Sequence, residues 1–308
     1  MKAIGVVRPD FTPRVYDIDE PVAAPGGVVV DVMAASVSDF DRAAVRGRYA
    51  EVTRPLFLGR DFVGRVTAVG ADVDYIDVGM YVAGVSAPRA PEQPGTFSQK
   101  VAVPAKLLAP VPAGVDLVHA AGVGLAGITA LSAIDALGPV DLGHLLIHGP
   151  VDGVGGYALQ VAKAHGAVVA VVTRPEETEL ARCLGADAVI PDSADPTEAV
   201  LRARYLLDGC VDSAIHIAGD PSVVADMVRP GGRFTSVADA ASPATRSDIE
   251  YRPTAVLPSG HKLADLLFKV AAGRMSSRVR HAVPFDQIFH AIDPSFPDSD
   301  GTTVLMRK

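Results

Sequence analysis

Short apolar runs rich in β-branched residues lie between glycine and proline residues over roughly the first hundred positions. The clearest runs cover residues 28–33, 62–69 and 81–85. Runs of this length with such boundaries predict strands. We therefore expect the first part of the chain to form a small β-barrel.

The pattern changes after Pro110 and Pro112. An alanine-rich apolar stretch there predicts one helix over 119–136. Beyond it, the predicted strands are 145–148, 168–173, 211–217 and 233–237, and the predicted helices are 154–165 and 176–184. Gly166 and Gly185 stand where helix C-termini favour glycine. The apolar strands are typical of a parallel sheet buried on both faces, so this part predicts a doubly wound nucleotide-binding sheet.

The C-terminal part predicts an amphipathic helix over 263–272, ended by Gly273, and short strands at 282–285 and 302–306. We expect this tail to return to the first domain. The predicted fold class is α/β, with a β-barrel domain formed by residues 1–115 and 254–308 and a doubly wound parallel sheet domain formed by residues 116–253.

Composition and charge exclude several classes of protein. The 308 residues include 28 Lys and Arg against 36 Asp and Glu, so the net charge of −8 argues against a nucleic-acid partner. The longest apolar stretches fall short of the ~20 residues that span a membrane, and Arg8 comes too early for a secretion signal. We expect a cytoplasmic protein that binds neither nucleic acid nor membrane.

A series of short motifs runs along essentially the whole chain. They are Met1–Ala3, Ser38–Asp41, Arg46–Tyr49, Gly59–Val66 with Val69-Gly70, Gly95–Phe97, Gly127–Ala130, His148–Gly156, Leu184–Asp187 and Pro230–Arg233. In this order they resemble the zinc-independent quinone oxidoreductases of the medium-chain dehydrogenase/reductase superfamily. The resemblance implies a GroES-like barrel domain, a Rossmann domain, NADPH as hydride donor and a homodimer.

The resemblance also bears on zinc. Alcohol dehydrogenases with the same layout hold a catalytic metal through a Cys, a His-Glu pair and a second Cys. Here Ser38 stands at the first Cys and Arg60-Asp61 at the His-Glu pair, and a guanidinium does not ligate a cation. We therefore expect a protein without metal.

The segment 145–156 has the strand, turn and helix start that a dinucleotide fingerprint needs. The family pattern resembles Ala-x-Gly-Gly-Val-Gly, but Asp152 replaces the glycine that lets the backbone approach the pyrophosphate. A like-charge pair at ~5 Å and an effective dielectric of ~20 costs on the order of 3 kcal/mol. Alternatively, Asp152 turns outward and caps the helix. We expect Asp152, Gly153 and Val154 to contact the cofactor, although a turn that no longer binds a dinucleotide explains the same residues.

Thr173 and Arg174 follow the second strand of the sheet, where an NAD site normally places an acid. A Thr hydroxyl can donate to the ribose and an Arg can pair with a 2′-phosphate, which favours NADPH. Glu176 and Glu177 weaken the local positive field, although acids also suit the first turn of a helix.

Three more cofactor contacts are implied by the resemblance. Thr129 is similar to a residue that lines the nicotinamide pocket, His216 takes the place of a common acidic residue, and the backbone of Val237 corresponds to a contact of the carboxamide. Helix packing explains Thr129 equally well, and a buried, hydrogen-bonded histidine is the default for His216.

Without a metal, we expect direct hydride transfer to a quinone or an α,β-unsaturated carbonyl. Tyr49 matches a family tyrosine at the substrate mouth and can donate to a carbonyl oxygen, or its ring packs on a barrel loop. Ser38 replaces the usual Asn and can contact substrate or ribose. Arg60 either recognises an anionic substrate or pairs with Asp61.

The predicted function is that of an NADPH-dependent quinone or enone reductase. The alternative is a non-catalytic or regulatory protein that keeps the fold but binds its nucleotide poorly, because Asp152, Ser38 and His216 depart together from the family pattern. We expect the loops at 87–94 and 240–252 to shape the substrate pocket, and the exposed edge strand of the cofactor domain to pair in a dimer.

Overall fold

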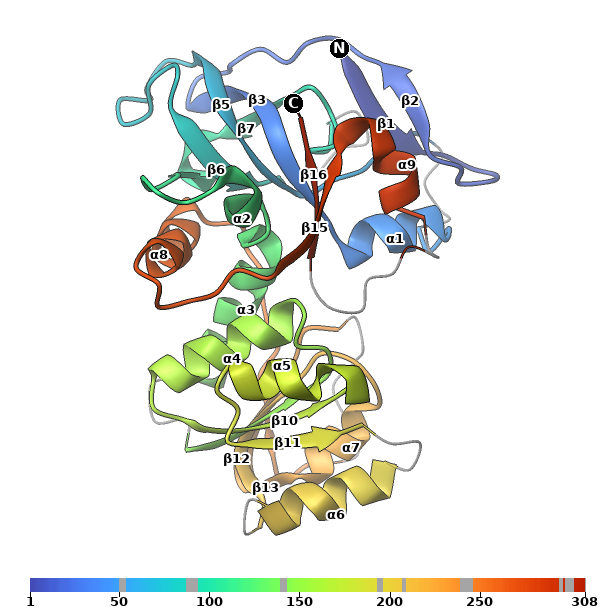
Figure 1. Ribbon diagram of the computed structural model, residues 1–308, viewed down its shortest axis with the longest axis vertical. Coiled ribbons are helices and arrows are strands. Elements are labelled where there is room, and N and C mark those ends of the chain that lie inside the picture. Colours follow the sequence, from blue (N-terminus) through green and yellow to red (C-terminus); the bar gives the residue numbers. More distant parts are fainter. Residues whose placement is uncertain are drawn as a thin grey trace. The chain divides into compact units, whose positions relative to one another are not determined.

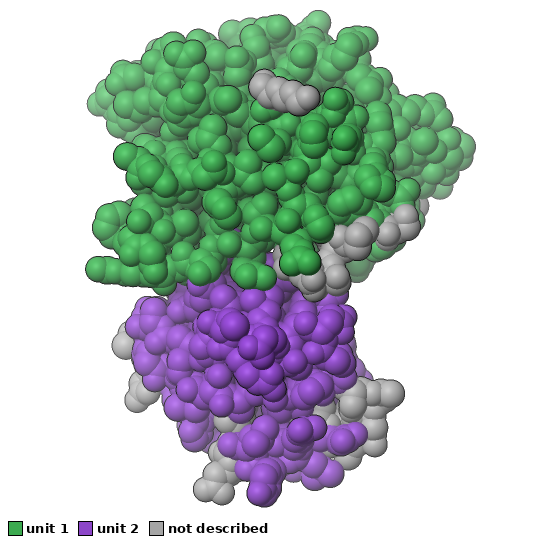
Figure 2. All heavy atoms as spheres, viewed as in Figure 1, with its two compact units in different colours: residues 1–125, 258–308 green, residues 126–257 purple. Residues whose placement is uncertain are grey.

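The computed structural model describes residues 1–49, 54–86, 94–138, 143–192, 196–206, 209–238, 246–293, 296 and 302–307. The chain divides into two compact units, shown in different colours in Figure 2. Unit 1 comprises Met1–Leu125 and Pro258–Lys308, and unit 2 comprises Ala126–Leu257. In the described residues, no helix has the length and apolar character needed to cross a membrane.

Unit 1 is built mainly from antiparallel strands (Figure 1). Its described residues form a seven-stranded sheet of β3 (Gly27–Val37), β5 (Asp61–Val69), β6 (Tyr81–Val85), β7 (Lys100–Pro104), β8 (Leu108–Pro110), β15 (Val279–Pro284) and β16 (Thr302–Met306). A three-stranded sheet contains β1 (Lys2–Val6), β2 (Arg14–Asp17) and β4 (Leu56–Phe57). The strands predicted near 28–33, 62–69 and 81–85 are confirmed.

The core of unit 1 lies between these strands. Val30, Phe62 and Val82, from β3, β5 and β6, and Leu58, just after β4, are at most 1% exposed. Because β16 pairs antiparallel with β3, the strand Thr302–Met306 belongs to unit 1. The described helices of this unit include α1 (Asp39–Val45), α2 (Leu117–Ala121), α8 (Gly260–Ala271) and α9 (Ile288–Ala291).

The single helix predicted over 119–136 is wrong. The structure has α2 and then a separate helix α3 (Gly124–Leu137). A Cβ at Gly122, which ends α2, would lie 2.6 Å from a side-chain carbon of Val279, so the chain passes close to β15 at this point. The backbone N–H of Leu125 then donates to the buried carboxylate of Asp61 at 2.6 Å. A carboxylate at a helix N-terminus stabilises the unpaired N–H groups there, so Asp61 favours the start of a new helix.

Unit 2 contains one parallel sheet. Its described strands are β9 (His144–His148), β10 (Val168–Thr173), β11 (Ala188–Pro191), β12 (Val211–His216), β13 (Val228–Ser236) and β14 (Glu250–Tyr251). Their order in the sheet is β11-β10-β9-β12-β13-β14, and all pairings are parallel. This is the doubly wound order of dinucleotide-binding domains, so the predicted fold class is confirmed.

The helices of unit 2 cover a sheet that is apolar on both faces. The described helices after α3 are α4 (Val154–Ala164), α5 (Thr178–Cys183), α6 (Pro196–Leu206) and α7 (Pro221–Asp226). Leu145, Ile147 and Val169, on one face, have no exposed surface, and Leu146 and Ala170, on the other face, are at most 1% exposed. Gly166 and Gly185 follow α4 and α5 with φ of 80° and 98°, so both predicted helix ends are confirmed. The predicted helix at 176–184 begins with a 3₁₀ turn, Pro175–Glu177.

Candidate functional site

The predicted site residues fall into two groups, one in each unit. Ser38, Tyr49 and Arg60 belong to unit 1, and the other eight belong to unit 2. The strand order of unit 2 reverses between β9 and β12, which is where such sheets bind nucleotides beyond the carboxyl ends of their strands. We call the segments that follow β9, β10, β12 and β13 the switch-point edge.

A tight turn joins β9 to α4 at this edge. Gly149 has a φ of 129°, and a Cβ there would lie 2.9 Å from the backbone nitrogen of Ala218. A Cβ at Gly155 would lie 2.3 Å from the carbonyl oxygen of Pro150. A Cβ at Gly153, just before Val154 starts α4, would meet nothing within 4 Å. The loop is thus packed on its inner side and open at Gly153, which fits the approach of a phosphate group.

Asp152 forms an ion pair that the sequence did not suggest. Its Oδ2 lies 3.1 Å from Nη2 of Arg174, and the side chains are 22% and 37% exposed. Arg174 also donates to Glu177, and its Nε lies 3.9 Å from Glu176. Burial lowers the pKa of Arg174, but the carboxylates of Glu177 and Asp152 outweigh it and raise that pKa. The charge of Asp152 is therefore partly balanced within the protein.

Glu177 connects the turn after β9 to the end of β10. Its side chain is completely buried. One carboxylate oxygen accepts from the backbone N–H of Val151 at 3.1 Å and from the hydroxyl of Thr173, and the other accepts from Arg174. Thr173 is only 1% exposed. Sequence reasoning placed Glu177 in a helix's first turn and missed this role; the spacing of four residues from Thr173 was the only signal.

Two histidines end the strands that flank the reversal of strand order. His148 and His216 are paired in register, and their rings stack with centroids 6.2 Å apart. Nε2 of His216 lies 3.1 Å from the carbonyl oxygen of Gly219 and therefore carries the proton, while Nδ1 accepts from the hydroxyl of Ser236 at 2.9 Å. Burial lowers the pKa of His216, so this ring is neutral at pH 7. Nδ1 of His148 donates to Ala218.

The remaining predicted contacts in unit 2 lie on α3 and after β13. Thr129 is 8% exposed. The N–H of Val237 donates to the carbonyl oxygen of His216 at 3.0 Å, so this donor is used within the sheet. Of the loops expected to shape the pocket, residues 87–93 and 240–245 lie outside the described residues.

The three predicted residues of unit 1 lie together around Phe40. The guanidinium carbon of Arg60 is 3.8 Å from the centroid of the Phe40 ring, within the range of a cation–π contact. The ring of Tyr49 lies 4.9 Å from that of Phe40, with an angle of 37° between their planes. Ser38 begins α1, which carries Phe40. We call Phe40, Tyr49 and Arg60 the aromatic–arginine cluster.

Two buried carboxylates border this cluster. Asp41 accepts from the N–H and the hydroxyl of Ser38 at 2.9 and 2.7 Å, and from the N–H of Gly59 at 2.7 Å. Burial raises the pKa of Asp41. Asp61 accepts from the hydroxyl of Ser36 at 2.6 Å and from the helix N–H described above, and burial raises its pKa to about 7.

The expected pairing of Arg60 with Asp61 is wrong. Both carboxylate oxygens of Asp61 accept hydrogen bonds from other groups. Within the part of the chain that the structure describes, no ion pair involves Arg60, whose guanidinium stacks on Phe40 instead. Burial lowers the pKa of Arg60, and the nearby Asp41, Tyr49 and Asp61 oppose that shift, so Asp61 attracts Arg60 without forming an ion pair.

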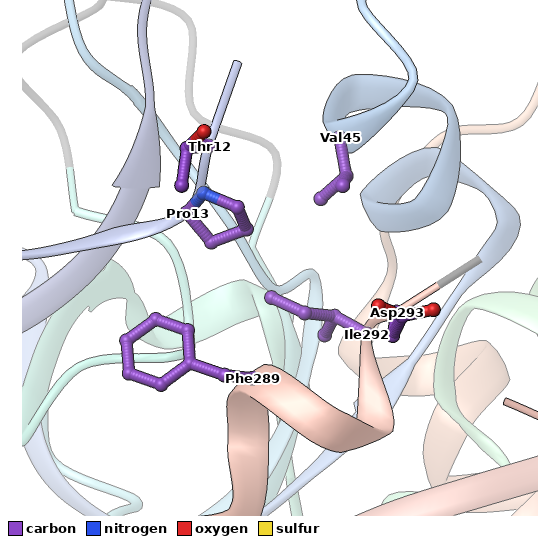
Figure 3. Close-up of a pocket in the computed structure, with 6 residues that line it drawn as sticks. All are labelled: Thr12, Pro13, Val45, Phe289, Ile292 and Asp293. Carbon is purple, nitrogen blue, oxygen red and sulfur yellow. The ribbon is translucent and has the colours of Figure 1, made fainter. Parts of the chain in front are cut away.

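One pocket lies outside both groups of predicted site residues. Figure 3 shows a pocket of about 290 Å³ in unit 1, lined by Thr12, Pro13, Val45, Phe289, Ile292 and Asp293. None of the predicted site residues lines it. The described residues contain no group of three or more His, Cys, Asp or Glu side chains placed to hold a metal ion, and the absence of metal stays a prediction.

Comparison with protein families places both parts of the chain. Residues 24–113 match the alcohol dehydrogenase GroES-like domain, and residues 153–262 match the domain described as zinc-binding dehydrogenase. The first match lies within unit 1, and most of the second match lies within unit 2. The chain belongs to the medium-chain dehydrogenase/reductase superfamily. The resemblance inferred from the sequence motifs is thus confirmed, and the protein is classed as an oxidoreductase.

Individual relatives of this superfamily member support the same class. It is 28% identical over 312 residues to NAD(P)H oxidoreductase RTN4IP1, mitochondrial, of Danio rerio, covering 86% of this chain and 79% of that protein. It is 33% identical over 209 residues to the Mus musculus protein of that name, covering 61% of this chain and 52% of that protein, about half its length.

Solved structures of the superfamily share the fold over the whole chain. An alcohol dehydrogenase superfamily protein from Novosphingobium aromaticivorans has a TM-score of 0.87 at 26% identity, covering 100% of both chains. The quinone oxidoreductase of Escherichia coli complexed with NADPH has a TM-score of 0.84 at 19% identity, covering 99% of this chain and 100% of that chain. At that lower identity, the likeness concerns the fold alone.

Proposed function

We propose that the protein is a zinc-independent, NADPH-dependent reductase of quinones or α,β-unsaturated carbonyls. The observation that carries this proposal is the switch-point edge, where an open glycine turn lies beside Arg174, a partly exposed cation at the end of β10. A guanidinium at this position suits a 2′-phosphate. The name of the relative that is 28% identical over 312 residues, NAD(P)H oxidoreductase, supports the same class.

In this proposal the two parts of the chain have separate roles. Residues 116–253 bind the dinucleotide, and residues 1–115 and 254–308 bind the acceptor. Homodimerisation through the exposed edge of the parallel sheet and a cytoplasmic location belong to the same proposal. Ser38 and Arg60, at the positions of zinc ligands in related dehydrogenases, support chemistry without that metal.

The residues of the switch-point edge would hold the cofactor, whose nicotinamide supplies a hydride. Arg174, which contacts Asp152 in the protein alone, would bind the 2′-phosphate, and the buried Glu177 holds the backbone of Val151 in place. In unit 1, the phenol of Tyr49 would donate a hydrogen bond to the carbonyl oxygen of the acceptor as negative charge develops there. Ser38 is a positioning residue, because its hydroxyl donates to Asp41 at the start of α1.

Titration of the purified protein with NADPH and with NADH tests the cofactor, and oxidation of NADPH with a panel of quinones and enones tests the reaction. We expect saturable binding that favours NADPH, and oxidation that depends on the acceptor. Confirmed binding without oxidation by any acceptor would refute the reductase.

A second candidate function is a non-catalytic protein that binds its nucleotide weakly. The observation that favours it is the set of three carboxylates, Asp152, Glu176 and Glu177, within 4 Å of one cation, Arg174. Failure of millimolar NADPH and NADH to bind would support this function.

A further inference from the structure

We propose that the acceptor carries a carboxylate group and that Arg60 binds it. This inference rests on the proposed reductase function and adds the charge class of its substrate. It follows from the surroundings of Arg60 in unit 1, and each step below concerns that unit alone.

The guanidinium of Arg60 is held on an aromatic ring and forms no ion pair among the described residues, although Asp41 and Asp61 lie near enough to attract it. Its carbon lies 3.8 Å from the centroid of the Phe40 ring, and its side chain is half-buried. Stacking uses the face of a guanidinium and leaves the N–H groups in its plane able to donate. A bidentate contact with a planar carboxylate needs this edge.

The two nearest carboxylates do not supply that contact. Asp41 accepts three hydrogen bonds from Ser38 and Gly59, and each oxygen of Asp61 accepts one. Because burial raises the pKa of Asp61 to about 7, this carboxyl group carries less negative charge at neutral pH than an exposed aspartate. No ion pair of Arg60 occurs among the described residues. A partly desolvated cation that forms no ion pair favours the binding of an anionic ligand.

The aromatic–arginine cluster also indicates two further properties of the ligand, a carbonyl group and a single negative charge. The ring of Tyr49 packs on the same Phe40, so a hydrogen-bond donor for a carbonyl and a cation for an anionic group belong to one cluster. One guanidinium balances one negative charge. In a chain with a net charge of −8, this favours a monoanionic carboxylate over a doubly charged phosphate.

The experiment uses 2,5-dihydroxybenzoate, a carboxylated hydroquinone, and its methyl ester as a neutral match. Both are titrated by calorimetry into the full-length protein with saturating NADPH, which cannot reduce a hydroquinone. We expect the acid to bind the unchanged protein at least tenfold more tightly than the ester. Arg60→Met should weaken binding of the acid by roughly 10- to 100-fold and leave the ester unchanged.

Two further variants serve as controls. Arg65→Met removes an exposed arginine from the same strand region and should behave as the unchanged protein. Arg60→Lys keeps the charge without the planar edge and should retain part of the preference for the acid. Equal binding of acid and ester, or a preference that persists in Arg60→Met, would overturn the inference. Oxidation of NADPH by neutral quinones is measured separately, so a protein that reduces them without preferring the acid refutes this inference alone.

Discussion

Replacing Asp152 with Asn should change the cofactor preference of the protein. The substitution removes the carboxylate that lies 3.1 Å from the guanidinium of Arg174 while keeping the side chain's shape. Arg174 then keeps its contact with Glu177 but loses its second close ionic partner. We expect NADPH to bind more tightly, because the 2′-phosphate no longer competes with Asp152.

The size of the effect follows from the geometry of this pair. Two unit charges 3.1 Å apart attract by about 5 kcal/mol at an effective dielectric of ~20. Because Arg174 is 37% exposed and Asp152 is 22% exposed, solvent screens most of that attraction, and the net value of such a pair is about 0.5 to 1 kcal/mol. Relief of repulsion between Asp152 and the cofactor phosphates adds a similar amount, so the gain for NADPH is roughly 5- to 30-fold.

The assay is a titration of each variant with NADPH and NADH at two salt concentrations. NADH lacks the 2′-phosphate and should gain only about two- to fivefold from the lost repulsion. Glu176→Gln is the matched control, because this 53% exposed carboxylate lies 3.9 Å from Nε of Arg174 and its removal should have a smaller effect. An equal gain for both cofactors would refute the assignment of Arg174 to the 2′-phosphate.

Three further predictions concern stability and the cofactor turn. Glu177→Ala should lower the free energy of unfolding by about 2 to 4 kcal/mol in urea titrations, because it leaves three buried or half-buried donors without their acceptor; a change below about 0.5 kcal/mol would contradict this. For Asp61, burial raises the pKa from 3.8 to about 7, so the folded protein binds a proton that the unfolded chain has released, and stability falls as the pH rises through that interval. Asp61→Asn should therefore flatten the pH dependence of the unfolding free energy between these values, and an unchanged slope would count against the shift. Gly155→Ala should lower the melting temperature and weaken NADPH binding, because the new methyl would lie 2.3 Å from the carbonyl oxygen of Pro150, whereas Gly153→Ala has open space and should leave the melting temperature unchanged.

Backbone architecture was the part of this protein that the sequence predicted best. The strands of the parallel sheet are apolar on both faces, and the glycines after α4 and α5 mark where those helices end. These features depend on residues near one another in the chain. The break between α2 and α3 was missed because the alanine-rich pattern continues through it, and the groups that cause the break come from β5 and β15.

Side-chain partners at the candidate sites were harder to predict. Arg174 and Asp152 are 22 residues apart, and only the fold brings them within 3.1 Å. Arg60 and Asp61 are adjacent in sequence, which suggested an ion pair. Successive side chains at the start of a strand point to opposite faces, so Asp61 faces Ser36 and the start of α3 while Arg60 faces Phe40.

The hydrogen bond from Val151 to Glu177 gives the cofactor turn a built-in reporter. Amides in loops usually exchange their hydrogen with solvent quickly, but this one donates to a completely buried carboxylate. Its exchange therefore requires Glu177 to release it, and the same carboxylate oxygen also accepts the hydroxyl of Thr173. The exchange rate of this single amide measures how often the turn opens, before any nucleotide is added.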